Sequence, residues 1–290
     1  PNFKCFGYYG GMPKLNLKNP EVEKYITDVA CYWIKECDID GWRLDVGDEI
    51  SHFFWKNFRK AVKAVKKDML IIGEIWHYAG DFLEGDEWDT VMNYPFYLNL
   101  IDLLADEKIT VSQFVQNLGY LKGRLNKNCY PLMWNLIDSH DTARFLHLCN
   151  DNKKKQHLAA AFQLLLPGMP MIYYGDEYAM PGANDPDCRR GMYWDEEYQD
   201  KEMYEWYKRL IQVRKSHACI VEGELAGSVT EDEEGTVVLI RKNGEETIAM
   251  IFNCSSSAKK FNEYTQKYNL LTENTFDGNV EGFDAAVIVL

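Results

Sequence analysis

The sequence has no long apolar run, and no stretch approaches the eighteen or so consecutive apolar residues that a membrane-spanning helix needs. Positive charge is also scarce, because 32 Lys and Arg residues stand against 45 Asp and Glu residues, which gives a formal net charge of −13. An acidic excess of this size repels phosphate backbones and anionic lipid headgroups. We therefore expect neither nucleic acid nor a membrane as a partner.

Paired cysteines are missing as well. The eight cysteines lie singly, and none forms a Cys-x-x-Cys pair, which argues against a zinc site or a thioredoxin-like redox motif. In a chain of 290 residues, scattered cysteines are typical of reduced core side chains in a reducing compartment. We therefore expect a cytoplasmic protein whose chemistry needs no metal and no other cofactor.

Up to about residue 216, short apolar runs alternate with helical patterns. Helical periods cover residues 20–37, 51–66, 95–106, 111–124, 153–166 and 199–216, and strands are predicted at 39–46, 69–75, 89–92, 132–138 and 169–174. The run at 69–75 does not alternate, as expected of a parallel strand buried on both faces. This repetition of strand and helix predicts an α/β domain with a parallel sheet over residues 1–216.

After about residue 217 the pattern changes. Strand-like runs at 237–240, 247–253 and 285–290 are separated by Gly, Asn and Ser, and no long helical period occurs. The dipeptide Asn243-Gly244 is a strong signal for a hairpin turn. We predict a small all-β sandwich domain over residues 217–290.

Carboxylates lie at the ends of three predicted strands. Asp45 ends the first of them, Glu74 ends the second, and Asp138 and Asp141 follow a third. In parallel α/β barrels the active site lies at the carboxyl ends of the strands. A single acid in such a place is usually a helix cap, whereas acids on three separate strands indicate a functional site.

Glycoside hydrolysis is a chemistry that needs such carboxylates, because a retaining glycosidase uses one as nucleophile and another as acid/base. Arg43 shares a strand face with Asp45, so its guanidinium should hold that carboxylate ionised, as a nucleophile requires. Glu74 stands beside Ile75 and Trp76 with no cation next to it in sequence, and an apolar setting suits a proton donor. These arguments leave the assignment provisional and do not choose between Asp138 and Asp141.

Three sequence blocks resemble those of the α-amylase family, glycoside hydrolase family 13. They are residues 41–46 (Gly-Trp-Arg-Leu-Asp-Val), 73–77 (Gly-Glu-Ile-Trp-His) and 139–144 (Ser-His-Asp-Thr-Ala-Arg), in that order along the chain. Residues 12–16 (Met-Pro-Lys-Leu-Asn) resemble a short segment typical of the neopullulanase, cyclomaltodextrinase and maltogenic amylase subfamily. Residues 173–177 and 184–189 are similar to that subfamily too, so the resemblance covers essentially the whole chain.

The resemblance implies a role for each site residue. Asp45 corresponds to the nucleophile, Glu74 to the acid/base, and Asp141 to the third carboxylate, which stabilises the distorted sugar and its oxocarbenium-like transition state. Arg43 and His140 are implied as partners of substrate or carboxylate. Trp76 and His77 are candidates for lining the sugar subsites, although core packing explains Trp76 equally well.

The resemblance also implies a parent larger than these residues. A family barrel has eight strands, and we count five, which correspond to about strands 4–8 of a partial (β/α)8 TIM barrel. The first three strands, an Asp-Asn-His block and an inserted loop domain would precede Pro1, where no signal-peptide pattern is seen, and any structural calcium would belong to that missing part. We expect a C-terminal fragment of a longer enzyme, inactive by itself and prone to self-association through its open strand edge, with a homodimer as one outcome.

The expected activity is that of a retaining α-glucan hydrolase. It would cleave α-1,4 or α-1,6 glucosidic bonds in maltooligosaccharides, cyclomaltodextrins or pullulan through a glycosyl-enzyme intermediate. Two alternatives stay open. A 4-α-glucanotransferase would use the same catalytic residues with a sugar acceptor in place of water, and a noncatalytic carbohydrate-binding relative would lack the carboxylates that are present here.

Overall fold

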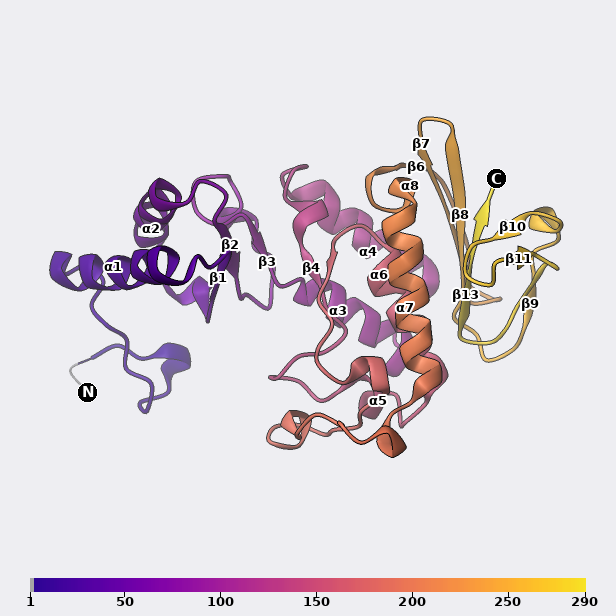
Figure 1. Cartoon of the computed structure of the whole chain (residues 1–290), viewed down its shortest axis with the longest axis horizontal. Helices are drawn as coiled ribbons and strands as arrows, with labels where there is room; N and C mark the ends of the chain where they lie inside the picture. Colours follow the sequence, from indigo (N-terminus) through magenta and orange to yellow (C-terminus); the bar gives the residue numbers. More distant parts are fainter. Residues whose placement is uncertain (1–2) are drawn as a thin grey trace. The chain divides into compact units, whose positions relative to one another are not determined.

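The structure is a computed structural model that describes residues 3–290, and the first two residues of the predicted 1–216 segment lie outside it. The chain forms two compact units. The first contains the residues up to Asn93 together with Arg124–Met133, and the second contains Tyr94–Gly123 and Trp134–Leu290. Figure 1 labels the helices and strands of both units.

The first unit is built on a parallel sheet of three strands in the order β1-β2-β3. Its strands are β1 (Gly41–Leu44), β2 (Leu70–Gly73) and β3 (Thr90–Val91), and its long helices are α1 (Pro20–Cys37) and α2 (His52–Val65). Figure 1 shows them in indigo and purple. The predicted strands and helices in this part of the sequence are therefore confirmed, with strands shorter than the apolar runs that indicated them.

Local sequence explains where these helices begin. Asn19 accepts a hydrogen bond from the N–H of Glu21 at 2.9 Å, and Pro20 occupies the first helical position of α1. Ser51 caps α2 in the same way through the N–H of Phe54. The buried side chains of α2 recur at a helical period, so this helix packs one apolar face into the unit: Phe54, Trp55, Phe58 and Val62.

The second unit begins with helices and a short parallel strand pair. The helices are α3 (Tyr94–Leu100), continued by a π-helical turn (Ile101–Ala105), α4 (Val111–Arg124), α5 (Phe145–Leu148), α6 (Lys153–Leu165), α7 (Lys201–Ser216) and α8 (Ala218–Glu222). The strands β4 (Trp134–Asn135) and β5 (Met169–Pro170) pair in parallel. All the predicted helices of this region are confirmed. The sequence did not indicate the short helices α5 and α8, and α8 lies within the segment 217–290 that was predicted to be all-β.

A sheet of six strands completes the second unit, in the order β11-β10-β13-β8-β7-β6. Its strands are β6 (Glu224–Glu231), β7 (Thr236–Asn243), β8 (Glu246–Asn253), β10 (Tyr268–Asn269), β11 (Asn274–Thr275) and β13 (Asp284–Val289), and β9 (Lys259–Lys260) pairs separately with β12 (Asn279–Val280). The predicted hairpin at Asn243-Gly244 is confirmed, because β7 and β8 are antiparallel and Gly244 takes a φ of +59°. The sequence did not indicate β6, an edge strand whose side chains are largely exposed, Leu225 and Val229 among them.

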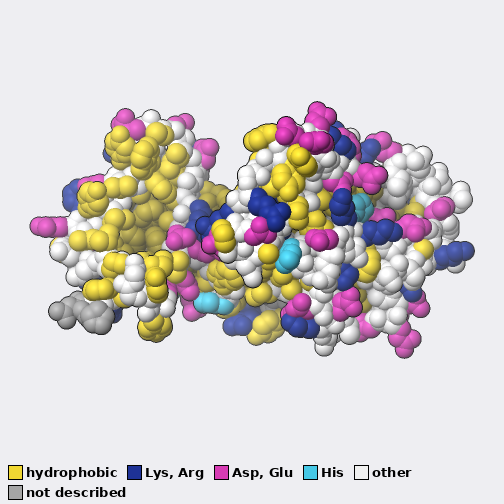
Figure 2. Space-filling model, turned by 90° about the horizontal axis from the view of Figure 1, so that it is seen from below, with side chains coloured by type: hydrophobic (Ala, Val, Ile, Leu, Met, Phe, Trp, Pro, Cys, Tyr) yellow, Lys and Arg dark blue, Asp and Glu magenta, His cyan; other side chains and the backbone are white. Residues whose placement is uncertain are grey.

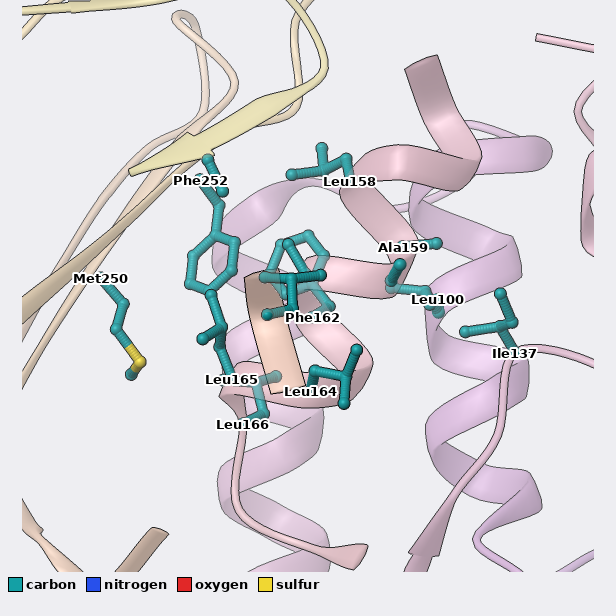
Figure 3. Packing of buried hydrophobic residues seen from close by; sticks show 14 of the residues in the cluster. Leu100, Ile137, Leu158, Ala159, Phe162, Leu164, Leu165, Leu166, Met250 and Phe252 are labelled. Atoms are coloured by element: carbon teal, nitrogen blue, oxygen red, sulfur yellow. The ribbon is translucent and has the colours of Figure 1, made fainter. Parts of the chain in front are cut away.

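One hydrophobic core joins α6 to this sheet. The rings of Phe162 on α6 and Phe252 on β8 stack with centroids 4.2 Å apart, and both side chains are fully buried. Leu158, Leu165 and Met250 belong to the same cluster, as Figure 3 shows. Helix α6 is buried on most of its surface, which explains why its sequence is rich in Ala and Leu.

Apolar side chains also reach the surface of the first unit, over which hydrophobic atoms gather in Figure 2. On α1, Tyr25, Tyr32 and Trp33 are all exposed. Single apolar side chains scattered over a protein surface are normal, whereas this one helix exposes three aromatic side chains.

Within residues 3–290, the structure contains no helix of the length and hydrophobicity required to span a membrane.

Candidate active site

The ends of β1 and β2 bring Asp45 and Glu74 to one edge of the sheet. The two strands are parallel, and Leu44 pairs with Gly73, so the acids occupy the next position on each strand. The N–H of Glu74 donates to the carbonyl of Leu44 at 2.9 Å, which continues the ladder past the last paired residues. The predicted placement of these two carboxylates on neighbouring strand ends is confirmed.

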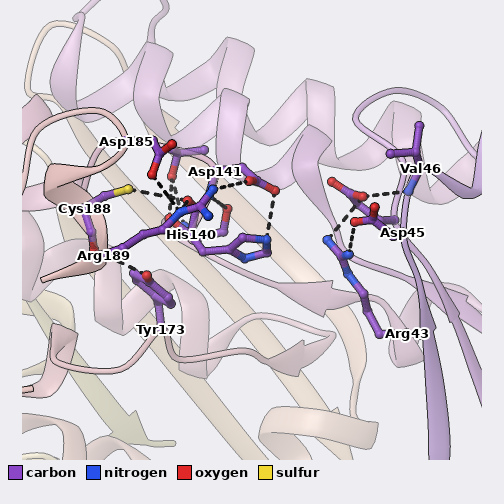
Figure 4. A network of polar contacts seen from close by, with 12 residues as sticks. Arg43, Asp45, Val46, His140, Asp141, Tyr173, Asp185, Cys188 and Arg189 are labelled. Carbon is purple, nitrogen blue, oxygen red and sulfur yellow. Dashed lines mark hydrogen bonds and ion pairs between the residues drawn. The ribbon is translucent and has the colours of Figure 1, made fainter. Parts of the chain in front are cut away.

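Arg43 connects the two acids. Its Nη1 forms an ion pair and hydrogen bond with Oδ1 of Asp45, and its Nη2 lies 3.2 Å from Oε2 of Glu74 (Figure 4). The contact with Asp45 is the one that sequence spacing predicted. The expectation that no cation adjoins Glu74 was wrong, because the guanidinium is long enough to reach across to the neighbouring strand.

Glu74 is held more tightly than Asp45. It is 5% exposed, Oε2 accepts the backbone N–H of Val46 at 2.8 Å, and Oε1 accepts Nε1–H of Trp76 at 3.1 Å. The side chain of Asp45, by contrast, is 69% exposed. The site thus combines one buried carboxyl group, held by two hydrogen bonds, with one carboxylate that is open to solvent.

The backbone after Asp45 is strained. Val46 adopts φ +45° and ψ +45°, a left-handed conformation that β-branched residues rarely take. This conformation turns the N–H of Val46 toward Glu74, where it makes its hydrogen bond. A bulky residue kept in this region at a pair of acids is consistent with a functional constraint.

The segment of residues 12–16 is anchored beside this turn. The Nζ of Lys14 donates to the carbonyl of Glu49 at 3.0 Å and pairs with the Glu49 carboxylate, and the same carboxylate accepts the N–H of Gly7 at 2.8 Å. These bonds lower the pKa of Glu49, with the hydrogen bond from Lys14 as the main cause. The segment therefore borders the turn that follows Asp45.

His77 contacts Asp48 rather than Asp45 or Glu74. Its Nε2 lies 3.1 Å from Oδ2 of Asp48, and its side chain is 68% exposed. Trp76 is 40% exposed, so it is not a core side chain, and its indole N–H is committed to Glu74. Both residues nevertheless leave ring surface open to solvent.

In the second unit, His140 and Asp141 form a second polar group with Arg189. The Nε2 of His140 lies 3.1 Å from Oδ2 of Asp141, and Nη2 of Arg189 lies 3.1 Å from Oδ1 (Figure 4). The Nε–H of Arg189 also donates to the carbonyl of His140 at 2.8 Å. Arg189 was not predicted as a site residue, although the similarity of residues 184–189 to the subfamily was the signal that could have indicated it.

The structure separates the two aspartates that the residue pattern left equivalent. Asp141 keeps 31% of its side chain exposed, whereas Asp138 is 1% exposed and accepts the N–H of Phe145 at 2.7 Å, at the start of α5. Asp138 therefore points into the protein and cannot meet a sugar. In residues 3–290, no group of three or more His, Cys, Asp or Glu side chains is arranged to hold a metal ion.

Comparison with known proteins matches residues 3–223 to the model of the alpha-amylase catalytic domain. The chain belongs to the alpha-amylase family. Three curated members align over most of the chain. A cyclomaltodextrinase of Geobacillus thermopakistaniensis is 46% identical, and the alignment covers 89% of this chain and 44% of the relative. An intracellular maltogenic amylase of Bacillus subtilis is 43% identical, over 87% of this chain and 43% of the relative. Neopullulanase 2 of Thermoactinomyces vulgaris is 42% identical, over 83% of this chain and 41% of the relative.

Among solved structures, a cyclomaltodextrinase superposes with a TM-score of 0.93 and 34% identity, over 99% of this chain and 52% of that structure. The resemblance to the cyclomaltodextrinase, maltogenic amylase and neopullulanase group, drawn from the sequence blocks, is thereby confirmed. The chain spans about half the length of the curated relatives that it matches.

Proposed function

We propose that the whole protein is a retaining α-glucan hydrolase with Asp45 as nucleophile and Glu74 as acid/base. The observation that carries the proposal is the placement of both acids on neighbouring strand ends, with Arg43 in contact with each. The exposed carboxylate can reach the anomeric carbon of a sugar, and the buried one is fixed by two hydrogen bonds. Family membership supports the same reaction class.

The reaction would proceed in two displacements. A carboxylate oxygen of Asp45 attacks the anomeric carbon as Glu74 transfers its proton to the departing glycosidic oxygen, which breaks the bond to the leaving sugar. The resulting glycosyl ester is then attacked by water, which gives a proton back to Glu74 while the bond to Asp45 breaks. Inverting the anomeric carbon twice leaves the configuration as it was.

The remaining site residues would bind and position the sugar. Asp141, paired with His140 and Arg189, would stabilise the distorted ring and its developing positive charge. Arg43 would hold the Asp45 carboxylate in place, since a guanidinium binds carboxylates through fixed geometry. Trp76 and His77 would offer ring surface to the sugar next to Glu74.

The fold proposal follows from the same comparisons. We infer that β1 to β5 are the equivalents of strands 4–8 of a (β/α)8 barrel, that residues 1–216 belong to the catalytic barrel, and that residues 217–290 form its all-β C-terminal domain. The superposition on a cyclomaltodextrinase over nearly the full chain supports this correspondence. The parallel order β1-β2-β3 agrees with consecutive barrel strands.

The substrates would be short α-glucans, with cyclomaltodextrins and pullulan preferred to long starch. The support is the anchored segment at residues 12–16 and the names of the curated relatives, which include cyclomaltodextrinase and neopullulanase. A cytoplasmic location fits the free state of all eight cysteines and the intracellular relative from Bacillus subtilis.

Stereochemistry tests the proposed mechanism. Proton NMR of the first product released from a maltooligosaccharide by the whole protein should show the α-anomer, before mutarotation begins. Initial release of the β-anomer would exclude the double displacement and the role given to Asp45.

A further inference from the structure

A buried cluster of charged side chains lies behind the turn that carries His140 and Asp141. Asp138, Arg144 and Asp176 are each at most 1% exposed, and all three belong to the second unit. Asp138 and Arg144 stand at the two ends of this turn, and Asp176 begins the short 3-10 helix Asp176–Tyr178 after β5. None of the three contacts sugar in the mechanism described above, so their burial needs another explanation.

Each of the two aspartates has one carboxylate oxygen that accepts a hydrogen bond and one that accepts none. Oδ2 of Asp138 accepts the N–H of Phe145 at 2.7 Å, and Oδ1 of Asp176 accepts Nη1–H of Arg144 at 3.1 Å. The other two oxygens, Oδ1 of Asp138 and Oδ2 of Asp176, are buried and receive no donor. Both aspartates lie next to Arg144, and each carboxyl group contributes to the shift in the other's pKa.

Two ionised carboxylates cannot hydrogen-bond to one another, because both only accept. A single proton between the two remaining oxygens would supply the missing donor and satisfy both. The same proton balances the charge, since one guanidinium then faces one carboxylate and one neutral acid. Ionising two neighbouring carboxyl groups in a buried site costs much free energy, because the two negative charges repel each other and neither is solvated.

Nε and Nη2 of Arg144 are also buried without a hydrogen-bond partner, but one guanidinium carries one positive charge and cannot neutralise two buried carboxylates. Other groups that face the pair add no positive charge. Glu177 adds negative charge near Asp176, and the hydroxyl of Tyr207 on α7 is buried, neutral and without a hydrogen-bond partner. The aromatic rings of Tyr173 and Tyr174 lie 4.5 and 4.9 Å from the Arg144 guanidinium carbon, so they cover that cation. Burial accordingly raises the pKa of Asp138 to about 6 and raises the pKa of Asp176 well above its ordinary value.

We propose that Asp138 and Asp176 share one proton, and that this acid pair is a positioning device that holds the turn bearing His140 and Asp141. Both ends of the turn are tied to it, through Asp138 at one end and Arg144 at the other. Arg144 also donates its backbone N–H to the carbonyl of Gly182 at 2.9 Å, which fixes the same end. The effect on catalysis rests on the proposed function, whereas the shared proton does not.

The proposal fixes the direction of a pH effect. The pair binds its proton more tightly in the folded protein than two separate aspartates do in the unfolded chain. Its stabilising contribution is therefore complete below the ordinary aspartate pKa and is lost as pH rises through the raised pKa of the pair. Above that value, two carboxylates face one guanidinium, and the turn should loosen.

Replacing one acid by its amide provides a test. Asp138→Asn supplies a permanent N–H for Oδ2 of Asp176, keeps an acceptor for Phe145, and leaves the ion pair of Asp176 with Arg144 intact. Chemical unfolding of the whole protein, repeated from acid to alkaline pH, should show that this variant loses the decline in stability on the alkaline side. Asp195→Asn, at an exposed position, should keep the wild-type profile.

The second aspartate gives an independent measurement. Asp176→Asn should also flatten the profile, and the double variant Asp138→Asn/Asp176→Asn should be less stable than either single variant at every pH, because Arg144 then has no carboxylate. A wild-type pH dependence in both single variants would overturn the shared proton. A double variant as stable as the singles would overturn the charge balance with Arg144.

Kinetics separates the positioning role from simple stability. If the whole protein hydrolyses maltooligosaccharides, Asp138→Asn should extend kcat/KM toward alkaline pH by a measurable shift of the descending limb, with the acid limb unchanged. An unshifted limb, with the stability profile flattened, would remove the positioning role and keep the shared proton. Absence of hydrolysis in the wild-type protein would count against the proposed function alone, because the unfolding measurements do not depend on it.

Discussion

Val46 donates its backbone N–H to Oε2 of Glu74 at 2.8 Å, so the residue that follows the exposed Asp45 directly fixes the buried Glu74. The left-handed conformation of Val46 aims that N–H. The nucleophile candidate and the acid candidate are therefore linked through one peptide unit as well as through Arg43. A change at either acid should disturb the other, and their contributions to catalysis should not be additive.

The first prediction concerns Asp45. Asp45→Asn in the whole protein should lower kcat by about 10³-fold or more, since an amide cannot form the glycosyl ester, while the fold is kept because this side chain is largely exposed. Hydrolysis of a maltooligosaccharide and thermal unfolding would be measured together. Asp81→Asn, at an exposed position in the same unit, serves as the control, and activity within tenfold of wild type would remove Asp45 from the nucleophile role.

The second prediction concerns the two terminal nitrogens of the Arg43 guanidinium, one near each acid. Arg43→Lys keeps the positive charge and loses the planar pair of donors that reaches Asp45 and Glu74 together. We expect kcat/KM to fall by about 10- to 100-fold, which corresponds to roughly 1.4–2.8 kcal/mol of lost transition-state stabilisation. Equal activity of the lysine variant would show that charge alone, without the double contact, suffices.

Trp76 provides a third prediction. Trp76→Phe keeps a ring beside Glu74 and deletes the indole N–H that bonds to Oε1. One hydrogen bond to a neutral acid is worth about 0.5–1.5 kcal/mol, so kcat should fall by about 2- to 10-fold with little change in KM. A rise in KM with kcat preserved would instead indicate that Trp76 acts as a sugar platform.

A fourth prediction follows from the clamp between Lys14 and Glu49. Lys14→Met should free the segment of residues 12–16 from the turn after Asp45, because both its bonds to Glu49 are lost. We expect the ratio of kcat/KM for cyclomaltodextrin over soluble starch to fall, with hydrolysis of a short chromogenic maltoside changed less. Lys18→Met, at an exposed position nearby, is the matched control.

The fifth prediction is a pH dependence of stability. Burial lowers the pKa of His157 to about 4, and its ring stacks on Trp206 at 3.8 Å. Asp284, 3.5 Å away, has a pKa raised to about 6 by its own burial, so it gives little attraction to a protonated ring. The folded state binds this proton less tightly than the unfolded state, so the stability is present above the unfolded histidine pKa and lost as pH falls through about 4.

The measurement is acid unfolding of His157→Gln against wild type. A pKa difference of this size corresponds to about 3 kcal/mol of pH-dependent stability between pH ~6.5 and ~4. The variant should lose most of that acid-side dependence, whatever its stability at neutral pH. Parallel unfolding profiles for the two proteins across this range would contradict the assignment.

The sequence by itself determined the local parts of this protein. Apolar periods located α1, α2, β1 and β2, because helix and strand patterns are set by neighbouring residues. The same runs placed Asp45 and Glu74 at strand ends, and the contact of Arg43 with Asp45 follows from a separation of two residues in one strand. The sequence blocks also identified the family that the comparisons confirm.

Only the tertiary structure decided what depends on distant neighbours and on burial. The second contact of Arg43, to Glu74, joins residues 31 positions apart, and that of Arg189 with Asp141 joins residues 48 apart. Asp138 and Asp141 are three residues apart and chemically alike, yet one is buried and the other is open. A carboxyl group's ionisation is set by the solvent and charges around it, and those are fixed only when separate elements pack together.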